Sequence, residues 1–204
     1  MYGERGPSWP QCQTLRFVIA EAARALRAWQ KQTGQPGLRM HVNLSVGELL
    51  EPDIEAYIVG QLHRHELAAD AITIEMTESA MMRGNTLAFG RLAQLRARGI
   101  PLCIDDFGTG YSSLRYVRDF SVDALKIDRS FVECADGSLG SAPIVRMLIQ
   151  LCTDYALDVV AEGVETAAQA AALQALDCRY AQGFYFYRPM SAAAISRLLR
   201  DRAS

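Results

Sequence analysis

The sequence lacks several features that would assign it to a specialised class of protein. Its five cysteines include no C-x-x-C pair, which argues against a zinc site or a disulfide framework and fits a reducing compartment. No apolar run approaches the ~20 residues that span a bilayer. The start, MYGERGPSWPQCQ, has no apolar core of a secretory signal. These absences predict a cytoplasmic protein without a membrane segment.

An excess of charge of one sign is also missing. The 204 residues carry a net charge of −2, and no basic block stands out. The chain therefore has no general attraction for nucleic-acid polymers or anionic membranes. The composition still allows a small anionic ligand, provided that cations are recruited at its binding site. Half of the residues are apolar and 22% are charged, as in ordinary globular proteins.

What the sequence does contain is an alternation of helical and extended patterns. Residues 1–13 read as an irregular lead-in, and 14–204 read as one domain without a linker. Thr14 is the expected N-cap of the first helix. Helices are predicted over 14–30, 53–67, 86–99, 112–120, 142–157, 166–176 and 191–201, and strands over 38–45, 71–79, 101–108, 123–131, 158–165 and 180–187.

This alternation predicts an α/β fold with a parallel sheet. Polar residues recur near the C-terminal ends of all six strands, at spacings of 32, 30, 21, 36 and 20 residues: Asn43, Glu75, the Asp105–Asp106 pair, Lys126, Glu162 and Gln182. An open doubly wound sheet would alternate too, but it would not bring six strand ends around one point. We therefore predict a TIM-like (β/α) barrel, N-terminally incomplete, with about six of the eight strands.

The adjacent carboxylates Asp105 and Asp106 are the most unusual feature. Two like charges at bonding distance raise each other's pKa, so ionising both costs free energy unless a cation compensates. Either the pair faces water as a solvated strand end, or something positive lies between the two groups. Asp, Glu and Asn oxygens are ligands that suit Mg²⁺ or Mn²⁺ rather than zinc.

The motifs VNLS, IEMTES, DDFGTGYSSL, LKIDRSF, AEGVET and QGF occur here in the order of the EAL-type cyclic-di-GMP phosphodiesterase domain. Residues 15–199 resemble that family. The resemblance implies a modified TIM barrel that binds two Mg²⁺ or Mn²⁺ ions and hydrolyses cyclic di-GMP to linear pGpG.

The resemblance also implies site roles. The first metal would take Asn43, Glu75 and Asp105, and the second Asp105, Asp106 and Glu162. Catalytic positions would be Lys126, Glu162 and Gln182, around the attacking water and the scissile phosphate. Glu78 would anchor a flap that links the metal site to a dimer surface: Phe107, Gly108, Thr109, Gly110, Tyr111, Ser112 and Ser113.

The sequence departs from the family at its beginning. The family's Glu-Ala-Leu triplet, whose Glu is a ligand of the first metal, has no counterpart here, and a nearby dinucleotide-binding Arg is missing too. We expect either a fragment with a false start or a shortened member with impaired hydrolysis. The alternative is a degenerate module that binds cyclic di-GMP or a protein. An enolase-like barrel fits the ligands but not the Asp pair. Two absent strands would leave open edges, which favours a homodimer or fused sensory domains.

Several residues have simpler interpretations. Asn43 could satisfy backbone groups, and Lys126 could be a snorkelling surface lysine. Glu162 could instead cap the following helix, but Glu165, which lies beside Thr166, suits that role better. Glu78 reads equally as a loop anchor or as an acid in a first helical turn. His41 is a candidate core residue, His63 and His65 lie on a polar helix face, and the aromatic residues 184–187 are expected to pack in the barrel rather than stack on bases.

Overall fold

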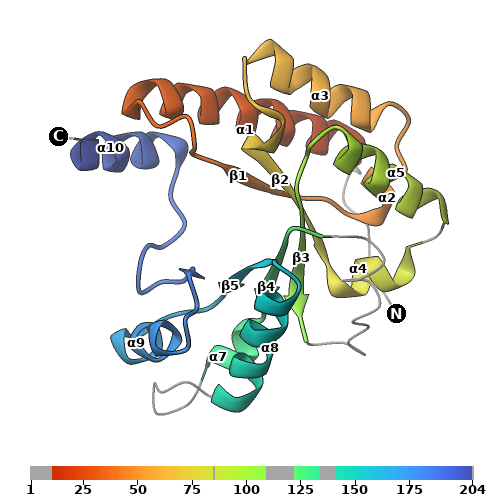
Figure 1. Cartoon of the computed structure of the whole chain (residues 1–204). Coiled ribbons are helices and arrows are strands. Elements are labelled where there is room, and N and C mark those ends of the chain that lie inside the picture. The colour runs from red at the N-terminus through yellow and green to blue at the C-terminus, as the bar shows by residue number, and fades with distance from the viewer. Residues whose placement is uncertain (1–10, 85, 109–121, 134–140, 204) are drawn as a thin grey trace, which may run out of the picture.

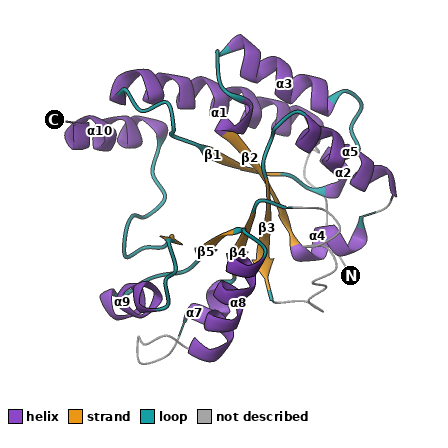
Figure 2. Cartoon of the chain, viewed as in Figure 1, coloured by secondary structure: helices purple, strands orange, loops and turns teal. Residues whose placement is uncertain are grey.

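The structure is a computed structural model, and it describes residues 11–84, 86–108, 122–133 and 141–203 (Figure 1). Six strands form one parallel sheet in the order β1-β2-β3-β4-β5-β6, which curls into a half-barrel (Figure 2). The predicted parallel α/β barrel architecture is thus confirmed. The strands are β1 (Met40–Asn43), β2 (Ile72–Thr77), β3 (Leu102–Phe107), β4 (Ala124–Ile127), β5 (Asp158–Ala161) and β6 (Tyr180–Ala181).

Helices cover the outer face of the curled sheet (Figure 1). Sequential strands are neighbours in the sheet and run parallel, so each connection returns the chain to the same end of the sheet. The helices are α1 (Gln11–Thr33), α2 (Val46–Leu49), α3 (Ile54–Arg64), η1 (Ala69–Ala71), α4 (Glu78–Arg83), α5 (Thr86–Ala97), α7 (Arg129–Val132), α8 (Ala142–Asp154), α9 (Ala167–Ala175) and α10 (Ala192–Ala203).

The hydrophobic core lies between the sheet and these helices. Alternate strand residues such as Ile74, Ile104 and Leu125 are at most 2% exposed, and helix residues Ile58 and Leu95 are fully buried. Each such side chain stabilises the fold by about 1.5–3 kcal/mol. The other set of alternate positions therefore faces the concave side of the sheet, where the predicted polar residues lie.

The last strand is much shorter than predicted. After Ala181 the chain turns, and the N–H of Tyr185 donates to the carbonyl of Val164 at 2.9 Å. The aromatic side chains 184–187 are 42–49% exposed, so the prediction that they pack inside the barrel is wrong. β6 is an edge strand of the sheet, and within the described residues no further strand pairs with it.

Most other element boundaries also differ from the predictions by a few residues, and β5 ends at Ala161 rather than at 165. The first helix begins at Gln11, so Thr14 lies inside it and is not its N-cap. The fourth extended segment ends at Ile127, and α7 follows because the Asp128 side chain accepts a hydrogen bond from Ser130 N–H at 2.9 Å. The helix predicted over 112–120 lies outside the described residues.

The first and last described helices lie side by side, although they come from opposite ends of the chain (Figure 1). The Trp29 indole N–H donates to the Ser196 hydroxyl at 2.8 Å, and the Gln32 amide donates to the Ser196 carbonyl at 2.7 Å. These bonds join α1, which precedes β1, to α10, which follows β6. The C-terminal part of α1 is therefore bonded to α10, while β1 and β6 remain the two edges of the described sheet.

Gly183 lies where the chain turns after β6, and the neighbouring backbone leaves no room there for a methyl group. A Cβ at this position would lie 2.2 Å from the Val164 carbonyl oxygen. We predict that Gly183→Ala lowers the free energy of unfolding by about 1–3 kcal/mol through this overlap. A Cβ at Gly60 in α3 would have no atom within 4 Å, so Gly60→Ala serves as the control and should stabilise by about 0.5–1 kcal/mol. Equal melting temperatures of Gly183→Ala and the unmodified chain, measured by circular dichroism, would contradict this account.

Candidate metal and phosphodiester site

Strand register brings the predicted polar residues to one end of the concave face. Asn43 lies opposite Glu75, Glu75 lies opposite Cys103, and Thr77 lies opposite Asp105. The Cα positions of Asn43 and Glu75 are therefore neighbours on adjacent strands, although the Asn43 side chain is exposed and that of Glu75 is buried. The C-terminal ends of parallel strands meet at one edge, as the sequence pattern predicted.

Lys126 lies at the centre of this edge. Its side chain is only 7% exposed, and its Nζ lies 3.2 Å from Glu75 Oε1, 3.2 Å from Asp105 Oδ1 and 2.5 Å from Glu162 Oε1. The flanking residues Leu125 and Ile127 are buried on the opposite face of β4. Lys126 therefore points into the concave side, and the surface-lysine interpretation is wrong.

The two adjacent aspartates reach the same site through an irregularity in β3. Pairing of β3 with β4 shifts register between Ile104 and Phe107, and Asp106 adopts a left-handed φ of 55°. Neighbouring residues of a regular strand point to opposite faces, but a bulge can turn both toward one side. Carboxylate oxygens of Asp105, Asp106 and Glu162 all lie within 4.8 Å of one another. The sequence DDFG thus supplies two acids to one site.

Burial and mutual repulsion both act against ionisation of the acidic group. Burial first, and then the charge of Asp105, raise the pKa of Asp106 above its usual value. Burial also raises the pKa of Glu162 despite its contact with Lys126, and the charges of Asp105 and Asp106 add to this. The Lys126 ammonium contacts Glu75, Asp105 and Glu162, and Asp106 is a fourth carboxylate close to Asp105 and Glu162. One ammonium among four carboxylates leaves an excess of negative charge, so the site favours an additional cation.

The pKa values of Glu75 and Lys126 shift in the directions that keep both groups charged. Burial acts to raise the pKa of Glu75, but the hydrogen bond with His41 and the charge of Lys126 together lower it. Burial acts to lower the pKa of Lys126, but the hydrogen bond with Glu162 and the surrounding carboxylates raise it above its usual value. Glu75 is therefore held as a carboxylate and Lys126 as an ammonium.

Glu162 and Gln182 are joined directly. The Gln182 Nε2 donates to Glu162 Oε1 at 2.5 Å, and the same oxygen contacts Lys126. Thr166, rather than Glu162 or Glu165, caps α9 through a capping box with Gln169. Glu162 is therefore available to the site, and Gln182 fixes its orientation.

Glu78 reaches the loop that follows β3. Its Oε2 accepts a hydrogen bond from the N–H of Gly108 at 3.0 Å, and its side chain is 2% exposed. Gly108 has a φ of 99°, and a Cβ there would lie 2.7 Å from the ring of Phe131, so glycine is required. Of the predicted flap, Phe107 and Gly108 are described, whereas residues 109–113 lie outside the described residues.

Two residues that the predicted site did not include also lie in it. His41 Nδ1 is 2.7 Å from Glu75 Oε1, and the ring is 39% exposed rather than part of the core. Cys103 is buried beside Glu75 on the next strand. The period-2 pattern could have found both, because His41 is two residues before Asn43 and Cys103 is two residues before Asp105.

Comparison with known proteins shows which family has this fold. The family model of the EAL domain matches residues 14–189. The chain belongs to the EAL domain family. It is 39% identical over 184 residues to the cyclic di-GMP phosphodiesterase NbdA of Pseudomonas aeruginosa, covering 90% of this chain and 23% of NbdA. The chain spans less than two thirds of the length of the other curated relatives compared with it, which are 34–39% identical.

Solved EAL structures share the fold closely. The EAL domain of Mycobacterium smegmatis DcpA is 32% identical and superposes with a TM-score of 0.86, covering 94% of this chain and 86% of that one. Klebsiella pneumoniae BlrP1, in a complex with manganese and cyclic di-GMP, is 34% identical with a TM-score of 0.74, covering 86% and 45%. None of the described helices of this chain combines the length and apolar character needed to cross a membrane.

The position of Lys126 predicts a link between stability and metal. Without divalent ions, Lys126→Met should lower the free energy of unfolding by about 3 kcal/mol, because it leaves three buried or half-buried carboxylates without their counter-charge. Mn²⁺ should recover part of this loss by supplying positive charge. Urea denaturation in EDTA and in MnCl₂ measures both effects. Lys31→Met, at an exposed position of α1, is the control; a Lys126→Met protein as stable in EDTA as this control would contradict the prediction.

Proposed function

We propose that this EAL domain carries the chemistry of metal-dependent hydrolysis of cyclic di-GMP to linear pGpG, with low turnover in the 204-residue chain. The observation that supports this most is the convergence of Glu75, Asp105 and Glu162 on Lys126 at the C-terminal ends of three strands. The similarity to NbdA and to the BlrP1 complex makes cyclic di-GMP the substrate to test.

The donor set fits two hard divalent cations. The described site residues carry more negative carboxylates than positive ammonium groups. The carboxylate oxygens of Asp105, Asp106 and Glu162 lie close enough to share one coordination sphere. These three residues would hold one Mg²⁺ or Mn²⁺, and Asn43, Glu75 and Asp105 would hold the other. When bound, such ions lower the pKa of water and stabilise the oxygens of an in-line displacement at phosphorus.

The remaining residues bind and orient. Lys126, as an ammonium among the acids, suits a contact with the oxygens of the scissile phosphate. Gln182 holds Glu162 in position through its hydrogen bond at 2.5 Å. Glu78 holds Gly108, just after β3, through the hydrogen bond that its Oε2 accepts from the Gly108 N–H.

Low turnover follows from the donor set of the first metal. The family's Glu-Ala-Leu glutamate has no counterpart in this sequence, and loss of a ligand weakens metal binding strongly. We expect residues 14–204 to form the domain and to work in the cytoplasm. We also expect a second copy or a fused sensory domain to cover the open sheet edges β1 and β6. A second candidate function, cyclic-di-GMP binding without hydrolysis, is favoured by the same incomplete donor set.

Asp105→Asn tests the enzymatic proposal, with Asp154→Asn on the exposed face of α8 as the control. We expect the chain to release pGpG slowly with Mn²⁺ and not with EDTA. Asp105→Asn should reduce the rate at least about tenfold, because it removes a charge from a ligand shared by both metals. Chromatography of the products measures cleavage, and calorimetry measures dinucleotide binding.

The outcomes separate the two functions. Mn²⁺-dependent cleavage that Asp154→Asn retains and Asp105→Asn loses supports the phosphodiesterase. Binding of cyclic di-GMP without any cleavage supports the binding module. A folded chain that neither binds nor cleaves the dinucleotide would exclude both.

A further inference from the structure

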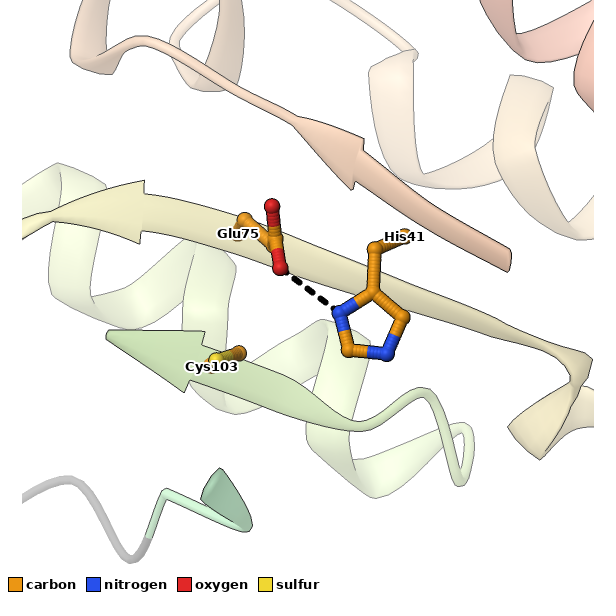
Figure 3. A group of neighbouring side chains, drawn as sticks. All are labelled: His41, Glu75 and Cys103. Carbon is orange, nitrogen blue, oxygen red and sulfur yellow. Dashed lines mark hydrogen bonds and ion pairs between the residues drawn. The ribbon is translucent and has the colours of Figure 1, made fainter. Parts of the chain in front are cut away.

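Three side chains of different chemistry meet inside the half-barrel, beside the acidic group. His41, Glu75 and Cys103 come from the neighbouring strands β1, β2 and β3 and lie close together on the concave side (Figure 3). One ligand atom of each lies within 4.8 Å of the others. The closest pair is His41 Nδ1 and Glu75 Oε1, at 2.7 Å.

The strand register explains this grouping. Glu75 and Cys103 are direct partners across β2 and β3. His41 pairs with Thr73, so it is the diagonal neighbour of Glu75 on β1, within reach of a long side chain. The three positions are therefore fixed by backbone pairing within a sheet rather than by a loop.

An imidazole nitrogen, a carboxylate oxygen and a thiolate sulfur make a donor set for Zn²⁺ or Co²⁺. Sulfur and imidazole ligands select these ions over Mg²⁺, which prefers oxygen alone. Spacing rules such as C-x-x-C describe sites built within one or two loops, so they do not detect a site assembled from three strands. The absence of C-x-x-C therefore does not exclude this one.

His41 is the member of this group that reaches the open concave side. The His41 side chain is 39% exposed, and it lines a pocket of about 580 Å³ together with Thr73, Lys126 and Gln182. Cys103 is 1% exposed and forms the inner end of the group. Binding would replace the thiol proton with the cation, and the proton would pass to solvent.

We propose that His41, Glu75 and Cys103 form a binding site for a thiophilic divalent cation of the Zn²⁺ class, with a further coordination position open to water. Glu75 Oε1 also contacts Lys126 at 3.2 Å, so an ion on this oxygen competes with the Lys126 ammonium. Only Glu75 is shared with the ligands proposed for Mg²⁺ or Mn²⁺. The site does not depend on hydrolysis of cyclic di-GMP.

Co²⁺ is the probe that tests this site, because a cobalt–thiolate bond gives a charge-transfer band in the near ultraviolet. We expect the full chain to show this band on addition of Co²⁺ without nucleotide, and Cys103→Ser to lose it. Cys152→Ser, at a buried cysteine of α8, is the matched control and should keep the band. Co²⁺ bound by the carboxylates alone has no sulfur ligand and gives no such band.

His41→Gln provides a second variant, at a side chain that is 39% exposed. Calorimetry should show Zn²⁺ binding at least about tenfold weaker in His41→Gln than in the unmodified chain. No cobalt–thiolate band in the folded chain, or a band of equal strength in Cys103→Ser, would overturn the proposal. Unchanged Zn²⁺ affinity in His41→Gln would overturn it as well. None of these readouts uses cyclic di-GMP, so they are independent of the proposed hydrolysis.

Discussion

The Lys126 ammonium is surrounded by carboxylates from three other strand ends, and the geometry of the site depends on this contact. Lys126 lies within 3.2 Å of Glu75, Asp105 and Glu162, and Asp106 adds a further acid nearby. A buried ammonium without acids, or buried acids without a cation, would each cost several kcal/mol. Together they hold β2, β3, β4 and β5 at one edge and leave an excess of negative charge, which a divalent cation would balance.

The open half-barrel determines which groups around the acidic site are exposed to solvent and to cations. Helices cover the outer face and α1 joins α10, but β1 and β6 stay at the edges of the described sheet. The concave face consequently leaves His41 partly exposed and the aromatic segment 184–187 at the surface. The same openness gives cations a route to the acids and to the His41–Glu75–Cys103 group. A partner covering these edges would change both exposure and access.

Local sequence patterns predicted the parts of the structure that depend on local rules. The period-2 alternation around Lys126 and the polar strand ends anticipated the orientation of the site, and the alternation of elements anticipated the sheet. Tertiary packing decided the remainder. The extended pattern after Ala181 is interrupted where Gly183 contacts Val164, and the left-handed backbone of Asp106 results from a bulge that pairing with β4 reveals. The contact of His41 with Glu75 depends on diagonal neighbours across two strands, which only the register specifies.

Direct counting of bound Mn²⁺ tests the central claim that the strand-end acids gather divalent cations. The folded chain would be dialysed to equilibrium against MnCl₂, and the bound ion counted by electron paramagnetic resonance. A triple variant with Asp105→Asn, Asp106→Asn and Glu162→Gln would be dialysed in parallel. The account predicts that the unmodified chain retains at least one Mn²⁺ per molecule at concentrations where the triple variant retains almost none. Equal retention by the two folded proteins, or none by either, would contradict it.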